Sequence, residues 1–494
     1  MGTKSAWEVI DAVIDADSWT SWDVELPDPP SDSAYAEDLR VARAGTGLDE
    51  AVTTGVATVR GYRIAVLACD FRFLGGSIGV AAGERLTTAI RRATAGRLPL
   101  LALPTSGGTR MQEGTPAFLQ MLRITAAVTD HKAAHLPYLV YLRHPTTGGV
   151  FASWGSLGHA TFAEPGALIG FLGPRVFQVM HDSPFPQGVQ TAENLCARGL
   201  IDAVLPVTEL ADVVGRTLAA VAAPRNGHPE PRPDVSTPVA VPAWQSVCAT
   251  RRPDRPGTRA LLSHITSNLV ELNGTGQGER ASALILGLAR LDDRPCVLLG
   301  QDRDCTTPLG PEALRQARRG MRLAAELDLP LVTVIDTAGA ELSRQAEEGG
   351  LAGEIARCIA EMVTLPVPTI ALLLGQGTGG GALALLPADR VLAAQHAWLC
   401  PLPPEGASAI LFHDTAHAAD LVGRQGIRST DLYEAGFVDR IIPEHPDAAQ
   451  EPAAFCRRTG AVLRSELATL GAPGDRVRRL DTLASMDRTL AHTG

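Results

Sequence analysis

The amino-acid sequence presents one α/β pattern twice, in the same order and at nearly constant spacing. Apolar stretches at residues 98–104 and 329–336 each run into a threonine, and these two threonines lie 232 residues apart. Further apolar stretches at 136–143 and 367–374 each lead to a glycine cluster, again at a step of 232. Because such order over roughly 100 residues is hard to obtain by chance, the sequence predicts two copies of one folding unit.

The repeated order of strand, glycine turn and helix predicts the architecture. It indicates an α/β fold with mainly parallel strands, in which functional backbone lies at the turns. Both halves end in similar phrases that contain Asp202 and Asp439. Residues 222–242 carry six prolines among polar residues, as is typical of a linker. We therefore expect a first domain at 1–221 and a second at 243–494, related by internal duplication.

Helical periodicity follows the first apolar stretch of each half. In the first half the spacing places Leu119, Leu122 and Ala126 on one helix face. We expect a helix at this place in both halves. The face in the second half carries four apolar residues, Leu351, Ile355, Ile359 and Met362.

The glycine turns are the candidate site. A strand that turns into a helix on glycines leaves backbone N–H groups unpaired at the helix start, and these can hold an anion or a developing oxyanion. Glycine leaves the approach of a ligand unobstructed. One pair of turns in each half would form one oxyanion hole in each half, although the glycines could instead serve only close helix–strand packing. The candidates are Gly107, Gly108, Gly148 and Gly149 in the first half, and Gly339, Ala340, Gly380 and Gly381 in the second.

Two other motifs suggest different chemistry. Residues 375–380 satisfy the dinucleotide pattern GxGxxG, but the next strand-like stretch ends in Gln395 without the expected acid. Residues 75–79 satisfy GxSxG, but no His-Asp pair stands out as a partner for the serine. Both motifs are weaker indications than the duplicated turns.

One carboxylate follows the first turn of the first half, and two follow that of the second half. Glu113, Glu347 and Glu348 could act as general acids or bases, or could simply favour a helix N-terminus. The sequence leaves both roles open and favours the structural one.

Composition excludes several classes of protein. A net charge of −10 without a dense Lys/Arg stripe argues against a nucleic-acid surface. Eight scattered cysteines without a CxxC pair indicate buried, reduced thiols, and no spacing typical of a metal site occurs. The uncharged stretch 369–387 holds five glycines, which favours a strand, a turn and a helix over a membrane span. With an N-terminus that lacks a signal-peptide core, we expect a soluble, cytoplasmic protein.

Several phrases resemble the carboxyltransferase of bacterial acetyl-CoA carboxylase, with its β and α subunits fused in that order. In the first half they are FRFLGGSIG (71–79), SGGTRMQEG (106–114), PTTGGVFASWGSLG (145–158) and AEPGALIGFLGPRV (163–176). In the second half they are RPDRPGTRALL (252–262), GLARLDDRP (287–295), LPLVTVIDTAGA (329–340), GQGTGGGALAL (375–385) and PPEGASAIL (403–411). The resemblance covers nearly the whole chain and identifies it as a member of the biotin-dependent acyl-CoA carboxyltransferase family.

The resemblance implies a crotonase/ClpP-like spiral fold in each half, with acyl-CoA bound by the first and biotin by the second. Carried over to this sequence, Gly148 and Gly149 would hold the thioester carbonyl, and Gly380 and Gly381 the ureido carbonyl of biotin. The remaining turn residues would line the same cavity. Arg110 is a candidate contact for the CoA phosphates, with an ion-pair or surface role equally open.

The implied reaction moves a carboxyl group from carboxybiotin to acetyl-CoA or a similar short acyl-CoA, giving malonyl-CoA or its homologue, as in fatty acid biosynthesis. Backbone amides suffice for this chemistry because the cofactor is its own base. No biotinylation site or ATP-grasp module is found in the sequence. We therefore expect a biotin carboxyl carrier protein and a biotin carboxylase as separate partners of a homo-oligomer.

The sequence departs from the two-subunit enzymes at several places. No cysteine precedes Cys69, so the usual zinc ribbon and its metal are not expected, and Ala338 replaces a proline. The stretch 270–282 also differs from the α subunit. Two alternatives remain: a decarboxylase of malonyl thioesters, and a non-catalytic scaffold subunit of a carboxylase complex.

Overall fold

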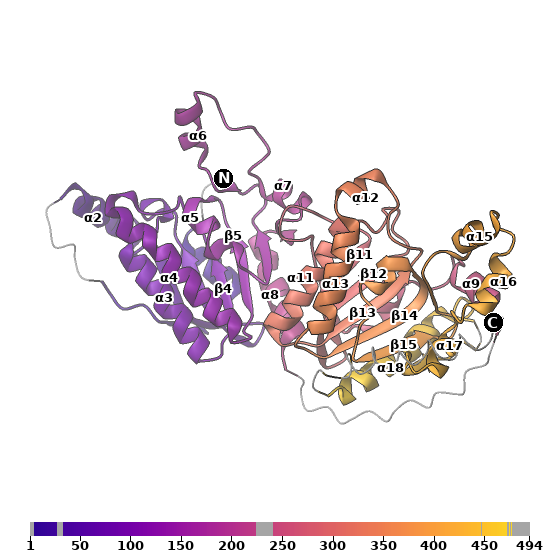
Figure 1. Ribbon diagram of the computed structural model, residues 1–494. Helices are drawn as coiled ribbons and strands as arrows, with labels where there is room; N and C mark the ends of the chain where they lie inside the picture. Colours follow the sequence, from indigo (N-terminus) through magenta and orange to yellow (C-terminus); the bar gives the residue numbers. More distant parts are fainter. Residues whose placement is uncertain are drawn as a thin grey trace. The chain divides into compact units, whose positions relative to one another are not determined.

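The computed structural model describes residues 4–26, 33–223, 241–445, 447–471, 474 and 476. It divides into two compact units (Figure 1). The first comprises Met1–Ala219 and Leu272–Glu279, and the second Ala220–Glu271 and Arg280–Gly494. Most of the expected linker, residues 224–240, lies outside the described residues.

The segment Leu272–Glu279 joins the first unit although it lies far along the chain. Asn273 holds it there, because its side-chain amide donates to the carbonyls of Cys196 (2.7 Å) and Ile201 (3.0 Å). The Asn273 N–H also donates to the carboxylate of Asp202 (2.9 Å). Both units therefore include residues from more than one stretch of sequence.

The first unit is built on a seven-stranded sheet in the order β1-β2-β3-β4-β5-β7-β9. The pairs β1–β2 and β2–β3 are antiparallel, and the others are parallel. Helices α3 and α4 pack against each other beside it (Figure 1). The elements are α1 (Ala6–Val13), β1 (Thr20–Ser21), α2 (Ala34–Thr46), β2 (Val52–Val59), β3 (Tyr62–Cys69), α3 (Val80–Ala95), β4 (Leu100–Leu103), α4 (Gly114–Ala133), β5 (Tyr138–Leu142), β6 (Thr146–Thr147), α5 (Gly148–Phe151), β7 (Ala160–Ala163), β8 (Ile169–Gly170), α6 (Pro174–His181), α7 (Ala192–Ala197), β9 (Ala203–Val204) and α8 (Val207–Val221).

The second unit repeats this arrangement in the order β10-β11-β12-β13-β14-β15-β17, with β16 paired to β14. The hairpin β11–β12 is antiparallel, and β12 to β17 pair in parallel. Helices α11 and α13 pack together as α3 and α4 do. The elements are α9 (Ala243–Thr250), α10 (Thr258–Ile265), β10 (Asn268–Leu272), β11 (Leu284–Leu291), β12 (Arg294–Gln301), α11 (Pro311–Leu327), β13 (Leu331–Thr337), α12 (Arg344–Glu348), α13 (Leu351–Thr364), β14 (Thr369–Thr378), α14 (Gly379–Leu383), β15 (Arg390–Ala394), β16 (Trp398–Cys400), α15 (Pro404–Phe412), α16 (Ala418–Arg424), α17 (Ser429–Glu434), β17 (Arg440–Ile442) and α18 (Pro452–Thr469).

The two matching aspartates make the same contacts in both units. Asp202 accepts a hydrogen bond from the N–H of Thr161 at 2.8 Å, and its own N–H donates to the Thr161 carbonyl at 2.8 Å. Asp439 accepts from the N–H of Val391 at 2.6 Å, and its N–H donates to the Val391 carbonyl at 2.8 Å. The predicted duplication is therefore present down to single hydrogen bonds.

The helix predicted in the first half is present as α4, but the apolar face that the spacing marks is not the one that the protein buries. Leu119 and Leu122 are 47% and 67% exposed, while α4 buries Ala117, Met121 and other residues of the opposite face. Both faces of α4 are apolar, so helical spacing alone could not choose between them. In the second half the prediction holds: α13 buries Leu351 and Met362 and partly buries Ile355 and Ile359.

The stretch 369–387 forms strand β14 and the short helix α14, as predicted. None of the helices in the described ranges is both long and apolar enough to cross a bilayer. In the same ranges, no three His, Cys, Asp or Glu side chains are grouped so that they could hold a metal ion.

One buried histidine makes the first unit sensitive to acid. His131 is fully buried, with Nδ1 3.0 Å from the Thr94 hydroxyl and Nε2 3.3 Å from the Pro137 carbonyl. Burial lowers its pKa to about 4. As pH falls below about 6.5, His131 is protonated in the unfolded chain, whereas in the folded chain it stays neutral until about pH 4. The stability that is present above pH 6.5 is therefore lost over this range.

We expect the free energy of unfolding to fall by about 3 kcal/mol between pH 6.5 and pH 4 through this residue. Urea titrations across this pH range would measure the loss. The variant His131→Gln should flatten the acid limb, whereas His135→Gln, at an exposed position, should not. An unchanged acid limb in His131→Gln would contradict the assignment.

Candidate active site

The first turn of each unit follows the strand in the middle of the repeat, β4 or β13. The hydroxyl of Ser106 accepts from the Gly108 N–H (2.9 Å), and the hydroxyl of Thr337 accepts from the Gly339 N–H (3.1 Å). Gly108 and Gly339 have φ values of 115° and 128°, which side chains rarely adopt. These two glycines are therefore required by the backbone and correspond to each other.

The second turn of each unit begins a short helix, α5 or α14. Thr147 and Thr378 stand at the N-cap positions. The residues after them, Gly148 and Gly379, have φ values of 60° and 62°. The backbone thus repeats at this turn as well.

These correspondences correct the predicted alignment of the halves. The step is 232 for the last residues of β3 and β12, Cys69 and Gln301, but 231 at both turns. The connection between β12 and α11 is one residue shorter than the connection between β3 and α3, since the N-cap residues Gly79 and Gly310 already lie 231 residues apart. Gly149 therefore corresponds to Gly380, rather than Gly148 to Gly380.

The two turns of each unit lie next to each other. A methyl group placed on Gly108 would lie 3.6 Å from the amide nitrogen of Gly149, and one on Gly148 would lie 3.4 Å from the Gly107 carbonyl. In the second unit, a methyl group on Gly381 would lie 3.3 Å from the amide nitrogen of Ala340. Each unit thus brings its own candidates together.

Several candidate amides are already engaged. Gly107 donates to the Gly75 carbonyl (2.8 Å), and Gly148 donates to the Phe171 carbonyl (2.9 Å). Within the described part of the chain, four candidate amides find no acceptor, those of Gly149, Ala340, Gly380 and Gly381. Gly149 and Gly380 are partly exposed, so a ligand oxygen can reach their amides.

Arg110 takes the ion-pair role. Its guanidinium is 1% exposed, pairs with Glu50, and donates to the Ser77 carbonyl at 2.8 Å. Arg110 and Glu50 line a cavity of about 740 Å³, together with residues of α2 and α3. The guanidinium therefore has its hydrogen-bonding capacity committed inside the protein, and we do not assign it to the CoA phosphates.

The carboxylates also have structural contacts. Glu113 accepts from the N–H of Val80, the first residue of α3, at 2.5 Å and from the hydroxyl of Tyr35. Burial and Glu113 together raise the pKa of Tyr35 to about 12. Glu348 pairs with Arg344 at 2.7 Å on the exposed helix α12, and Glu347 lies in the first turn of that helix. These contacts fit the helix-terminus and surface roles.

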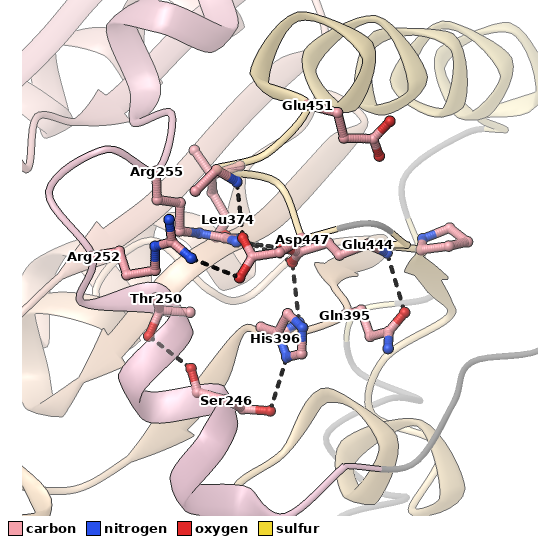
Figure 2. A network of polar contacts seen from close by, with 12 residues as sticks. Ser246, Thr250, Arg252, Arg255, Leu374, Gln395, His396, Glu444, Asp447 and Glu451 are labelled. Atoms are coloured by element: carbon pink, nitrogen blue, oxygen red, sulfur yellow. Dashed lines mark hydrogen bonds and ion pairs between the residues drawn. The ribbon is translucent and has the colours of Figure 1, made fainter.

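A buried ionic network that sequence reasoning missed supports the second unit (Figure 2). Arg255 and Glu444 form an ion pair in which both side chains are 0% exposed. Arg255 also donates to the carbonyl of Leu374 in β14 at 2.9 Å, and Glu444 accepts from the His396 N–H at 3.1 Å. The network thus holds the strand that leads to α14. Arg255 lies within the phrase 252–262, which hints at its importance but not its partner.

Comparison with known proteins agrees with this geometry. The carboxyl transferase domain family matches residues 1–467. A "Probable biotin-dependent acyl-coenzyme A carboxylase beta3 subunit" of Mycobacterium bovis is 61% identical over 465 residues, which cover 93% of each chain. The "Acetyl-coenzyme A carboxylase carboxyl transferase subunits beta/alpha" of Salinispora arenicola is 40% identical over 461 residues, 89% of this chain and 81% of that protein.

Solved structures agree on the fold. A crystal structure of transcarboxylase 12S superposes with a TM-score of 0.76, covering 96% of this chain and 91% of that chain at 20% identity. This likeness confirms the predicted α/β fold. Since the family match spans nearly the whole sequence and a relative with 61% identity covers 93% of it, this chain belongs to the carboxyl transferase domain family.

Proposed function

We propose that this chain is the carboxyltransferase component of a biotin-dependent acyl-CoA carboxylase. The observation that carries the proposal is the matched pair of glycine turns in each unit, with amides that find no acceptor among the described residues. Two such sites suit a reaction in which two different carbonyl oxygens gain negative charge. Membership of the carboxyl transferase family supports the same reaction class.

The first-unit turns are proposed to hold the acyl-CoA. Gly149 supplies the free amide. Gly148 lets the two turns lie close together, because a side chain there would meet Gly107 and Gly108. Gly107 and Gly108 shape the wall opposite. An amide fixed at this position stabilises the thioester oxygen as the acyl carbon loses its proton.

The second-unit turns are proposed to hold biotin through Gly380 and Gly381, with Gly339 and Ala340 beside them. The amides of Gly380 and Gly381, which find no acceptor among the described residues, fit the carbonyl oxygen of a cyclic urea. Biotin, carried in its carboxylated form by a separate protein, would supply the carboxyl group and the base. The amides would orient it and stabilise charge on its oxygen.

The names of the relatives support the substrate and the partners. We propose acetyl-CoA or a similar short acyl-CoA as the acceptor, with malonyl-CoA or its homologue as product. We further propose a biotin carboxyl carrier protein and a biotin carboxylase as separate partners, and a homo-oligomer as the working form. The two units serve as acyl-CoA and biotin domains with a boundary near residues 222–242.

The test is the reverse reaction. Purified protein is incubated with malonyl-CoA, with and without biocytin, and acetyl-CoA release is measured. Turnover that requires biocytin supports the proposal. Turnover without biocytin would instead indicate a malonyl-thioester decarboxylase. Absence of turnover under both conditions would indicate a scaffold subunit. If turnover requires biocytin, a forward assay with a carboxylated carrier and a panel of acyl-CoA substrates defines the chain-length preference.

A further inference from the structure

Gln301 connects the two turns of the second unit. It is the last residue of β12 and is 2% exposed. Its side-chain nitrogen donates to the Gly381 carbonyl in α14 at 2.7 Å. Its side-chain oxygen accepts from the Asp336 N–H in β13 at 3.2 Å. One buried amide group therefore contacts the backbone of both turn elements.

The side chain of Gln301 gives the Gly381 carbonyl the hydrogen bond that no N–H of α14 is seen to provide. In α14 the Ala384 N–H donates to the Gly380 carbonyl (3.0 Å), and the Leu385 N–H donates to the Ala382 carbonyl (3.2 Å). Neither of these two N–H groups therefore donates to the Gly381 carbonyl. Without Gln301 this buried group would lack a described partner, and the peptide would be free to turn toward another one.

The duplicated fold provides an internal comparison. The residue that corresponds to Gln301 in the first unit is Cys69, the last residue of β3. The backbone of Thr105 interacts with the Cys69 thiol and opposes the rise that burial causes in its pKa, at the position that matches Asp336 beside Gln301. A thiol is too short to add a second arm toward the following helix. The donor arm to Gly381 is therefore particular to the second unit.

A second contact fixes the β13 end. The buried carboxylate of Asp336 accepts from the Gln376 N–H at 2.9 Å and lies 3.4 Å from the guanidinium of Arg303. In the first unit the corresponding positions are Thr105 and Pro145, and proline has no N–H to donate. There the Thr105 hydroxyl donates to the Pro145 carbonyl at 3.2 Å instead. The two units therefore hold their turns through different side chains, and the contacts of Gln301 and Asp336 belong to the second.

We propose that Gln301 is a positioning residue for the second-unit turn pair, setting the orientation of Gly381 and thereby of the amides that receive biotin. The inference rests on the proposed function, since it assigns Gln301 to the biotin side of that reaction. A backbone site stabilises charge only when its donors are held close to their working positions. Gln301 acts through Gly381 and touches no reacting atom.

The test compares two buried glutamines of the same unit. Gln316 is 1% exposed and, like Gln301, makes two backbone contacts, donating to the Leu284 carbonyl (2.8 Å) and accepting from the Ala281 N–H (3.3 Å). It touches neither turn. The variants Gln301→Met and Gln316→Met remove equivalent hydrogen bonds at similar volume, and both should lower thermal stability by similar amounts.

In the malonyl-CoA assay with biocytin, Gln301→Met should lower kcat by about tenfold or more and leave KM for malonyl-CoA within about twofold. Gln316→Met should leave both constants near those of the wild type. Equal kcat in the two variants would overturn the inference, as would a matching rise in KM for malonyl-CoA.

A second variant, Gln301→Leu, with Gln316→Leu as its partner, covers the case in which methionine at position 301 prevents folding. The same kcat-specific loss is expected, and turnover equal to its partner's would count against the inference. Failure of the proposed function is read separately, on the wild type, as absence of biocytin-dependent turnover.

Discussion

Replacing Gly149 by valine is expected to lower biocytin-dependent turnover of malonyl-CoA by about 100-fold or more. Gly149 lies in the first turn of α5 and does not have the positive φ of Gly148, so a side chain is compatible with its backbone. A methyl group there would lie 3.3 Å from Cγ of Met121 and 3.4 Å from Oγ1 of Thr109. The branches of valine would occupy the space before the free amide and exclude the thioester oxygen.

The control for this experiment is Gly45→Val. Gly45 lies in α2 of the same unit, also without a positive φ, and nothing lies within 4 Å of a methyl group built on it. Gly45→Val should retain turnover and leave helix α2 formed, because valine has a somewhat higher helix propensity than glycine. Circular dichroism of both variants checks folding. A folded Gly149→Val protein with wild-type turnover would refute the assignment of this turn to the acyl-CoA.

The order of elements could be predicted because each middle strand is a buried apolar run. All described residues of β4 and β5 are buried, and their sequences are almost purely apolar. Such runs bounded by glycine turns are readable without a structure. The positions of the turns could be predicted as well, because a glycine follows each apolar run. Gly108 and Gly339 stand there because the backbone has a positive φ at both places.

The exact register of the repeat could not be predicted. Gly379, Gly380 and Gly381 are identical in sequence terms, and only the φ value of 62° at Gly379 marks which of them begins the helix. A one-residue difference between the β3–α3 and β12–α11 connections then shifted the alignment. A glycine run hides its own register because it has no side chains to distinguish its positions.

Contacts over long sequence separations were also beyond reach. From the sequence, Arg110 was a plausible ligand for a phosphate. In the structure it pairs with Glu50, which lies 60 residues earlier in the chain and is separated from it by β3 and α3. The role of Gln301 depends on β12, β13 and α14 meeting at one point. A single sequence gives the residues of such networks, but their partners are determined by tertiary packing.

The second large effect is expected at Arg255. Replacing Arg255 by methionine should lower the free energy of unfolding of the second unit by about 3–5 kcal/mol, because Glu444 would remain buried without its counter-charge. Burial alone would lower the pKa of Arg255, but the Glu444 carboxylate more than offsets this and raises it. The guanidinium is therefore charged throughout the physiological range, and the pair in Figure 2 is ionic.

Two further variants separate this explanation from simple loss of packing. The double variant Arg255→Met with Glu444→Gln removes both charges and should be more stable than Arg255→Met alone. Arg344→Met breaks the Arg344–Glu348 pair, whose side chains are 87% and 64% exposed, and should cost less than about 1 kcal/mol. Urea titrations, read by proteolysis of the second unit, measure all three. If Arg255→Met were no less stable than Arg344→Met, the buried Arg255–Glu444 pair would not be what stabilises β14. Such a result would mean that removing the cation leaves no costly unpaired charge on Glu444.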